Sequence, residues 1–575
     1  MADLLTVKSF ESGGPLEAPV ANAAFAPDER ALAAPAFTGV LKVHPAAMRT
    51  LPVLTQPLIQ GRDVRIFPGL QLEFFTVGDV LVPVQRGEMV RETGGGLTMS
   101  YWRVIPQPGK VWREPGDGDW SRAAFPIMLV NDTENHAHQG LATFLYRGNQ
   151  VSGLELQFVQ QTGPYLIKQY FVAWGFAQAE YAPVDASQLE ARRAQAQVEF
   201  ADRLPARPWS ELIKTVPAGT LDGFGGPLYP KWQVAGALVV GGTLYYQDPV
   251  TPYGSYPYPL EMRFGVRSIT KSVFAPLSLL QLAQVYGPWV LTLKIGDYVP
   301  GLDPKWRRVR FIDAANMSTG FGGVGGTRSD PNDILDGYLD GDYDAWYTAP
   351  SFADKIRQIN ATLHPYPWEP GTVMRYRDQD YFLLGAAIDS FIKSVRGTQA
   401  DLWQMVKTEI FEPIGIHQAP VVRTRESGGR DGIVWCNAGY YPTLDDLAKI
   451  ALLFQTRGAH GGVQILNRTL TEDLLAARDA IAKNGDAGGN GLYEMGFHFL
   501  RYQNANGTVK YLPSMRGSGD NEIVLYPNRM VSIVMAKASV DVLGPEKTRS
   551  DDGPGTIQAV ERLECCGEHL SLLGA

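Results

Sequence analysis

Cysteine is scarce in this chain of 575 residues. Only Cys436 and the adjacent pair Cys565 and Cys566 occur, which is too few for a disulfide framework in a protein of this length. The composition therefore suits a reducing compartment. Cys436 has no convincing histidine partner in the sequence, so we expect it to be a small, buried, apolar side chain.

Long apolar runs are also missing. No segment approaches the roughly 20 apolar residues that cross a bilayer. The first residues, MADLLTVKSFESGGPLEAP, carry acids and prolines where a secretory leader has a basic head and an unbroken apolar segment. These absences predict a soluble, cytoplasmic protein that does not enter a membrane.

A block of positive charge is the third absence. The formal net charge is -8, and the lysines and arginines are scattered along the chain. Nucleic-acid binding needs a clustered basic surface, so we expect no nucleic-acid partner. The glycine-rich runs near Gly94 and Gly322 lack the Lys and Ser or Thr of a phosphate-binding loop, and we expect no cofactor.

Residues of the types that can bind a metal form one cluster in the sequence. His136 and His138 lie close to Asp132 and Glu134 within a turn-rich Asn-Asp-Thr-Glu-Asn stretch. Such composition is more typical of a hydrated loop than of a metal site, so we expect no bound metal.

The length predicts at least two domains, because a single core stops growing at roughly 250 to 300 residues. Residues 1–50 are rich in Ala and Pro and suggest an extended arm. Residues 51–185 hold short β-branched and aromatic runs separated by Gly, Pro or Asn-Asp, which predict an all-β domain. The runs are LQLEFFTV, DVLVPVQ, SYWRVIP, FPIMLVN, ATFLYRG, GLELQFVQ and IKQYFVAWGF.

Residues 186–208 predict a linker helix, since DASQLEARRAQAQVEFADRL opens on an Asp N-cap candidate and contains no Gly or Pro. Residues 209–575 contain both helix-like and strand-like patterns. QVAGALVVGGTLYYQ predicts a hairpin, TKSVFAPLSLLQLAQVYG a buried helix, and NEIVLYPNRMVSIVMAKAS two strands joined at a Pro-Asn turn. The expected class is therefore α+β, with an all-β domain first.

The strongest chemical signal is Ser268-Ile-Thr-Lys271 at the start of that buried helix. Residues three apart share a helix face, so the hydroxyl and the amine would project together. A serine hydroxyl needs a neighbouring base before it becomes a good nucleophile. Ser-x-x-Lys alone is a weak motif, because Ser390 and Lys393 repeat it in what we expect to be an ordinary helix.

Context distinguishes the two copies. MRFGVRSITKS resembles the strand, turn and nucleophile helix of the serine β-lactamase-like and penicillin-binding-protein-like superfamily. Further segments follow in the order of that family, over roughly Val234 to Ala538. They are GDYVPGLDPKW, RFIDAANMSTGFGG, PYPWEPGTVMRYRDQDYFLLGAAID, IFEPIGI and CNAGYYPTLDDLAKIALLF. The resemblance extends to class C β-lactamases, family VIII esterases and D-aminopeptidases, and it implies an antiparallel sheet flanked by helices, with a helical subdomain.

The same resemblance implies site residues. Ser268 is the expected nucleophile, Lys271 its neighbour, and Tyr376 takes the place of the tyrosine in the family's Tyr-x-Asn motif, where it would shuttle the serine proton. Without the flanking match, Tyr376 would be read as a packed aromatic. The third motif position is Asp378 instead of Asn, and a carboxylate there would keep Lys271 charged.

A second departure lies near the end of the family segment. Met515-Arg516-Gly517-Ser518 aligns with the Lys-Thr-Gly or His-x-Gly motif that the family usually carries, with a possible shift of one residue. Gly517 would keep backbone close to the substrate, and the amide of Ser518 would join that of Ser268 in an oxyanion hole. Arg516 is either a ligand for a substrate carboxylate or a solvated surface residue.

These features predict a serine hydrolase that cleaves a carboxylic ester or amide of a small molecule or short peptide through an acyl-enzyme. The absence of a cation at Met515 argues against a true β-lactamase. Two alternatives stay open: an acyltransferase that passes the acyl group to an amine or alcohol, and a non-catalytic binding protein that kept the fold. Exposed sheet edges also leave a homodimer open.

Overall fold

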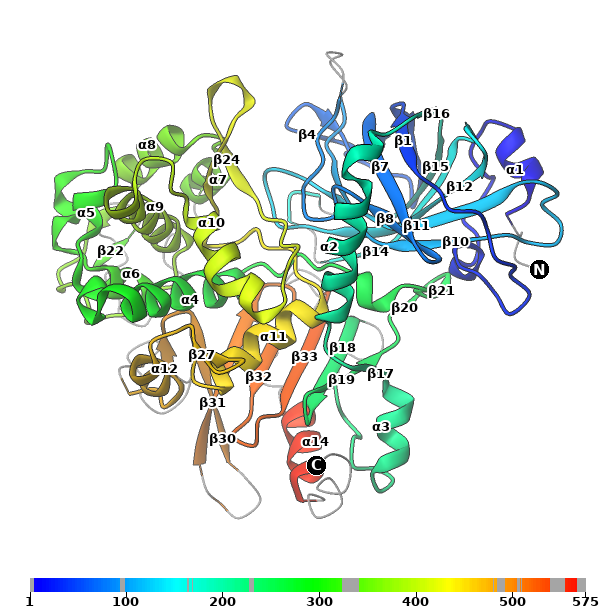
Figure 1. The fold of residues 1–575 in the computed structure, drawn as a ribbon. Helices are drawn as coiled ribbons and strands as arrows, with labels where there is room; N and C mark the ends of the chain where they lie inside the picture. The colour runs from blue at the N-terminus through cyan, green and yellow to red at the C-terminus, as the bar shows by residue number, and fades with distance from the viewer. Residues whose placement is uncertain are drawn as a thin grey trace.

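The protein divides into an N-terminal β domain and a C-terminal domain of helices around a second sheet (Figure 1). The computed structural model describes residues 5–93, 99–162, 165–167, 169–226, 232–322, 341–478, 480–482, 492–503, 507, 509–537 and 554–565. Helix α2 (Leu189–Ala201) stands between the two domains in the figure.

The β domain is an antiparallel sheet in the order β16-β1-β7-β8-β10-β11-β12-β14-β15-β3, with β13 beside β12 and β9 beside β11. The seven runs expected to be strands each contribute one, so that prediction is confirmed. The strands are β1 (Gly39–Val43), β3 (Arg49–Leu51), β7 (Leu70–Val77), β8 (Val80–Pro83), β9 (Arg103–Pro106), β10 (Gly109–Trp112), β11 (Ser121–Val130), β12 (His138–Arg147), β13 (Gln150–Val151), β14 (Leu154–Gln161), β15 (Val172–Ala177) and β16 (Ala179–Ala182).

The N-terminal segment is more than the extended arm predicted for residues 1–50. Strand β1 lies inside the sheet, paired with both β7 and β16, and β3 forms its opposite end. The sequence GVLKV of β1 alternates buried and exposed positions as a half-buried strand does. The strand was not predicted because it is only five residues long and its neighbours are rich in Ala and Pro.

The cores of the two domains are joined through the β sheet. Strand β11 is buried on both faces. Phe125 and Ile127 pack into the interior of the β domain. Ala124 and Met128, on the opposite face, belong to the apolar core that also contains Phe264 of the second domain. Because alternate strand residues face opposite sides, one strand serves both cores.

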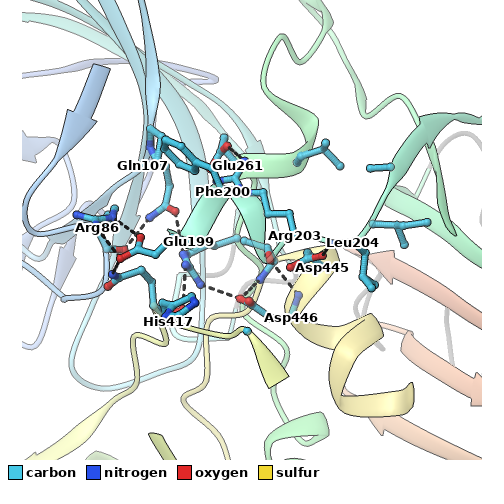
Figure 2. A pocket seen from close by; sticks show the side chains of 18 residues that line it. Arg86, Gln107, Glu199, Phe200, Arg203, Leu204, Glu261, His417, Asp445 and Asp446 are labelled. Carbon is cyan, nitrogen blue, oxygen red and sulfur yellow. Dashed lines mark hydrogen bonds and ion pairs between the residues drawn. The ribbon is translucent and has the colours of Figure 1, made fainter. Parts of the chain in front are cut away.

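A helix is present within the range 186–208, but it is shorter than predicted and does not start at the Asp N-cap candidate. Ala206–Pro208 form strand β17, and helix α2 begins at Leu189 after a 3₁₀ turn, with Gln188 as its N-cap. Its last turn presents Glu199 to Arg86 of the β domain, and both residues are buried. The carboxylate accepts two hydrogen bonds from the guanidinium, at 2.8 and 2.7 Å, beside a small cavity of about 70 Å³ (Figure 2).

The second sheet has the order β17-β19-β18-β33-β32-β31-β30-β29-β28 and is antiparallel except between β17 and β19. The predicted hairpin is β18 and β19, and the predicted pair around the Pro-Asn turn is β32 and β33. The strands are β17 (Ala206–Pro208), β18 (Gln233–Val240), β19 (Thr243–Gln247), β28 (Ile481–Ala482), β29 (Leu492–Glu494), β30 (Phe497–Gln503), β31 (Val509–Gly517), β32 (Asn521–Leu525) and β33 (Val531–Ala536).

Helices cover both faces of this sheet. Helices α3 (Trp209–Thr215) and α14 (Pro554–Cys565) pack on one face. The other face meets the buried helix α4 (Ile269–Tyr286), around which the remaining helices gather (Figure 1). These are α5 (Ile295–Tyr298), α6 (Phe311–Ala315), α7 (Gly341–Thr348), α8 (Phe352–Thr362), α9 (Asp378–Arg396), α10 (Leu402–Val406), α11 (Leu444–Gln455) and α12 (Arg468–Leu475). Within the described ranges, no helix is both long and apolar enough to span a bilayer.

The ion pair between helix α2 and the β domain gives a testable prediction about stability. Arg86→Met leaves the Glu199 carboxylate buried without its cation, so we expect the free energy of unfolding to fall by about 3 kcal/mol. Urea denaturation of the full chain measures it. The double variant Arg86→Met, Glu199→Leu removes the stranded charge and should recover most of the loss; a double variant as unstable as the single one contradicts this account.

Candidate active site

Ser268 stands at the first turn of the buried helix α4, as its N-cap. The helix-start position leaves the Ser268 hydroxyl free of any capping hydrogen bond. Residues Ile269 to Ala283 of the helix are all buried, which fixes its first turn against the rest of the core. The positive end of the helix dipole therefore points at the serine, where a developing negative charge would be stabilised.

Lys271 projects from the same face and reaches the serine. Its Nζ donates a hydrogen bond to Ser268 Oγ at 2.8 Å and a second to the carbonyl of Asn437 at 3.1 Å. Nζ also lies 2.5 Å from Asp378 Oδ1. The lysine is only 1% exposed, so these three oxygens replace its hydration.

The protonation state of Lys271 follows from this competition. Burial alone would lower its pKa, because a charged amine loses solvation in the protein interior. Asp378 and Tyr376 act in the opposite direction through charge and hydrogen bonding, and together they raise the pKa of Lys271 above its ordinary value. The amine is therefore held as a cation near neutral pH.

Tyr376 and Asp378 come from one short segment that enters α9. The Tyr376 ring centroid lies 4.8 Å from Lys271 Nζ; the ring meets Tyr493 edge-on and lies tilted beside His498. Asp378 is the first residue of α9, where the helix dipole favours a carboxylate. Its second oxygen accepts a hydrogen bond of 2.6 Å from the hydroxyl of Tyr343 in α7.

The end of β31 lies directly against the nucleophile turn. A side chain on Gly517 would put its Cβ 2.2 Å from the carbonyl oxygen of Val266 and 3.3 Å from the amide of Ile269. Met515, two residues earlier on the same face, is fully buried in the core that contains α4. The backbone therefore approaches Ser268 closely, and the Met515 side chain places a neutral thioether in the core beside it.

Arg516 and Ser518 do not share the surroundings of Met515 and Gly517. Arg516 alternates with Met515 and so faces the other side of the sheet, where its Nε lies 3.1 Å from Glu522 Oε1 of β32. A ligand role for Arg516 at the nucleophile does not fit this direction. Ser518 follows the strand and is exposed, and its carbonyl accepts from the Asn521 side chain at 3.0 Å.

Two residues of the site carried no signal of their own in the sequence. Asn437 supplies the backbone carbonyl for Lys271, and its side-chain amide is buried without a partner among the described residues. It lies within CNAGYYP, which the family resemblance covered without singling out any residue. Tyr343 lies in α7, in a stretch with no motif, and only the fold brings it to Asp378.

The other sequence predictions can now be placed. Ser390 and Lys393 lie on α9, and Lys393 pairs with Asp389 at 2.5 Å, as expected of an ordinary helix. Cys436 is buried, which raises its thiol pKa and agrees with an apolar role. Gly94 and residues 323–326 of the glycine-rich runs lie outside the described residues.

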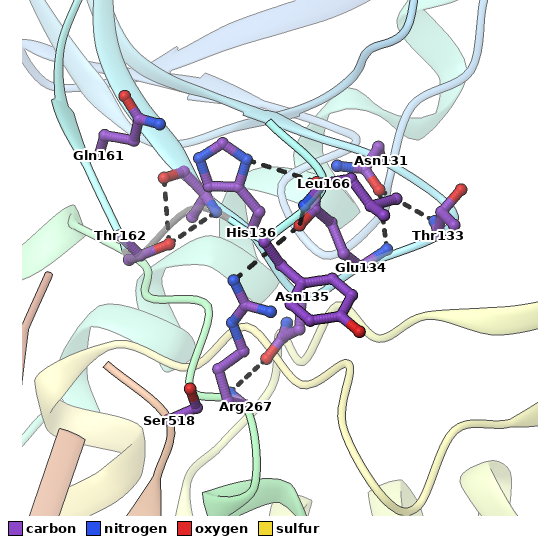
Figure 3. Close-up of polar contacts among 12 residues, drawn as sticks. Asn131, Thr133, Glu134, Asn135, His136, Gln161, Thr162, Leu166, Arg267 and Ser518 are labelled. Carbon is purple, nitrogen blue, oxygen red and sulfur yellow. Dashed lines mark hydrogen bonds and ion pairs between the residues drawn. The ribbon is translucent and has the colours of Figure 1, made fainter. Parts of the chain in front are cut away.

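The hydrated-loop interpretation of the histidine cluster is wrong. His136 and His138 are fully buried at the start of β12, with Glu134 fully buried nearby. Burial and the neighbouring Arg267 lower the pKa of His136 to about 3, so its ring is neutral. Asn131 follows strand β11 and is buried, and its Oδ1 accepts a hydrogen bond from the amide of Thr133 at 2.9 Å (Figure 3). The polar composition does mark a turn, but the His136 ring that follows it packs against Trp102 and His138 of the same domain.

Comparison with known proteins identifies the family of the second domain. The family model described as Beta-lactamase matches residues 233–541, which is 309 of the 575 residues. No curated relative matches the chain in sequence.

Several solved structures are similar in part. A Bacillus anthracis protein assigned as a 6-aminohexanoate-dimer hydrolase is 18% identical, with a TM-score of 0.45, over 64% of this chain and 88% of the other. A D-stereospecific amidohydrolase from Streptomyces sp. is 16% identical (TM-score 0.38; 61% and 97% covered), and a family VIII carboxylesterase is 15% identical (TM-score 0.39; 58% and 92%). Since the family model covers more than half of the sequence and its range holds Ser268 and Lys271, the chain belongs to the beta-lactamase family.

Proposed function

We propose that this protein is a serine hydrolase that cleaves a carboxylic ester or amide in a small molecule or short peptide. The observation that carries the proposal is the Lys271 amine, which hydrogen bonds to Ser268 Oγ while Asp378 holds it as a buried cation. The Ser268 hydroxyl makes no capping hydrogen bond to the helix and instead accepts one from Lys271, which is the arrangement expected of a nucleophile rather than of a structural N-cap.

In the proposed reaction, Ser268 Oγ attacks the substrate carbonyl carbon as its proton passes to Tyr376. Lys271, charged and 4.8 Å from the tyrosine ring centroid, stabilises the phenolate that accepts this proton. The tetrahedral oxyanion is placed at the amides of Ser268 and Ser518. Collapse releases the alcohol or amine, which takes up the proton, and leaves an acyl-enzyme on Ser268.

Water completes the cycle. It attacks the acyl carbonyl as one of its protons passes to Tyr376. When the bond between the acyl carbon and Oγ breaks, Tyr376 gives that proton to Oγ, which restores the Ser268 hydroxyl while the acid departs. The fully buried Met515 offers no charge for a substrate carboxylate. This favours neutral esters and amides over β-lactams, because the family resemblance implies a cation at that position for a substrate carboxylate.

Covalent labelling tests the nucleophile. A fluorophosphonate probe should label the wild-type protein, and Ser268→Ala should abolish labelling and lower ester hydrolysis by at least about 10³-fold, since no other group can form the acyl-enzyme. Ser390→Ala, in the second Ser-x-x-Lys copy, is the matched control and should label like wild type. Folded wild-type protein that never labels would overturn the proposed function.

The pH profile tests the role of Asp378. Burial lowers the pKa of Lys271 and Asp378 raises it, so Asp378→Asn should lower that pKa. If Lys271 acts as a cation, the alkaline limb of kcat/KM moves to lower pH in the variant. The reason is that the Lys271 amine, with its lowered pKa, loses its proton and its charge at a lower pH than in the wild type. An acidic limb that moves instead identifies neutral Lys271 as the base, and an unchanged profile contradicts the proposed coupling.

The close approach of β31 gives a steric test. Gly517→Ala places a methyl group 2.2 Å from the Val266 carbonyl, so the nucleophile turn or the strand must shift. We expect kcat to fall by about 100-fold, the cost of a displacement of roughly 1 Å at a reacting group. Gly116→Ala, which meets no atom within 4 Å, is the control. Equal kcat values for the two variants, measured with a chromogenic ester, would contradict this reading of the strand.

A further inference from the structure

The segment that leads to the nucleophile has no regular structure of its own. Residues 262–266 form neither helix nor strand, and Arg267, the residue before Ser268, has a φ of 53°. A long side chain in this left-handed region is uncommon and costs about 1 kcal/mol or more. Something outside the segment must therefore hold the turn in place.

The β domain supplies that support. Gln139 of β12 donates a hydrogen bond to the carbonyl of Arg263 at 2.7 Å. Gly265 passes so close to the loop before β12 that a Cβ there would lie 2.3 Å from the carbonyl oxygen of Asn135. At the strained position itself, the amide of Arg267 donates to Asn135 Oδ1 at 2.6 Å (Figure 3).

Asn135 also holds a second part of the site. Its Nδ2 donates to the carbonyl of Tyr440 at 3.1 Å, and the residue is 1% exposed. Tyr440 belongs to the segment in which Asn437 accepts a hydrogen bond from Lys271, and its own amide donates to Thr270 Oγ1 at 3.3 Å. One side-chain amide thus connects the turn before the nucleophile to the segment that binds the lysine.

The Arg267 side chain extends the contact in the same direction. Its guanidinium lies 4.0 Å from Glu134 Oε2, and Figure 3 shows it pointing from the nucleophile turn into the β domain. Glu134 also accepts from the hydroxyl of Tyr101 at 3.0 Å and from the amide of Leu166 at 3.2 Å. The buried carboxylate is therefore fixed by its own domain before it meets the arginine.

We propose that Asn135, a residue of the N-terminal β domain, is a positioning residue of the hydrolase site: its amide holds the Ser268 turn in register with the segment that binds Lys271. The inference rests on the proposed function and extends it, because the β domain then completes the active site. Asn135 touches neither substrate nor reacting atoms, so its effect is on the placement of Ser268.

The test compares Asn135→Ala with Asn22→Ala. Asn22 is equally buried and also connects the N-terminal region to the second domain, through Thr251 Oγ1 at 2.9 Å and the Gly254 carbonyl at 3.1 Å, yet these partners lie in the Thr251–Gly254 turn and not in the nucleophile segment. Both variants lose two hydrogen bonds between the domains, and Asn22→Ala also loses the one that Asn22 Oδ1 accepts from Gln157 Nε2 at 3.2 Å. A role in stability alone would therefore affect Asn22→Ala at least as much as Asn135→Ala.

We expect Asn135→Ala to slow fluorophosphonate labelling and kcat by roughly 10- to 100-fold with KM within about threefold, because the nucleophile is displaced and binding is not. Asn22→Ala should keep wild-type rates. Amide hydrogen exchange over residues 262–270 should accelerate only in Asn135→Ala. If that variant does not fold, the nearly isosteric Asn135→Asp, which keeps an acceptor for the Arg267 amide but loses the donor to Tyr440, should show a smaller slowing.

Equal labelling rates for the Asn135 and Asn22 variants, or wild-type rates in Asn135→Asp when it is the variant used, overturn the inference. Failure of the proposed function has a different signature, since wild-type protein itself would then not label. In that case the exchange measurement still decides whether Asn135 holds the turn.

Discussion

The buried ion pair between Lys271 and Asp378 is the interaction on which the rest of the site depends. Both side chains are almost fully buried, so each must recover in the protein the hydrogen bonds it loses from water. Ser268 and Asn437 accept the other hydrogen bonds of the lysine amine, and Tyr343 donates one to the aspartate. Four separate parts of the chain, α4, α7, α9 and the segment around Asn437, are thereby committed to one place. Burial alone would lower the pKa of Lys271, and the charge of Asp378 is the largest contribution that raises it, so the carboxylate at position 378 is what keeps the amine protonated.

Close backbone packing is the second constraint, and it explains why glycine occurs where it does. The start of α4 is surrounded by backbone on several sides. Gly517 of β31 touches the turn before Ser268, and Gly496, at the bend between β29 and β30, lies where a Cβ would be 2.9 Å from the Lys271 carbonyl. Gly265 leaves room for the loop of the β domain. With side chains excluded at these three points, the turn that carries Ser268 has little freedom to move, because its position is set by backbone contacts rather than by adaptable side chains.

Much of this could be predicted from the sequence, for a physical reason. The period-two strands, the apolar helix and the collinear family segments are local patterns, so β7, α4 and the pairing of Ser268 with Lys271 followed from residues near one another. Strand β1 was missed because its alternation is short and its flanks resemble linker. Asn135 and Tyr343 could not be found, since their partners lie 132 and 35 residues away and only the fold unites them. The burial of His136 was mispredicted because a polar turn suggests a solvated loop, whereas the ring packs against Trp102 and His138, the first of which is distant in sequence.

The relation between the domains follows from these contacts. A detachable accessory domain would have its own closed core and would meet its neighbour through a separate polar surface. Here one face of β11 belongs to the core of the hydrolase domain, and the loop between β11 and β12 reaches the residue before the nucleophile. The conformation of Arg267 is unfavourable in isolation, so the second domain can hold its catalytic turn only when the first is folded against it. Folding of the β domain and competence of the site are therefore two consequences of the same interface.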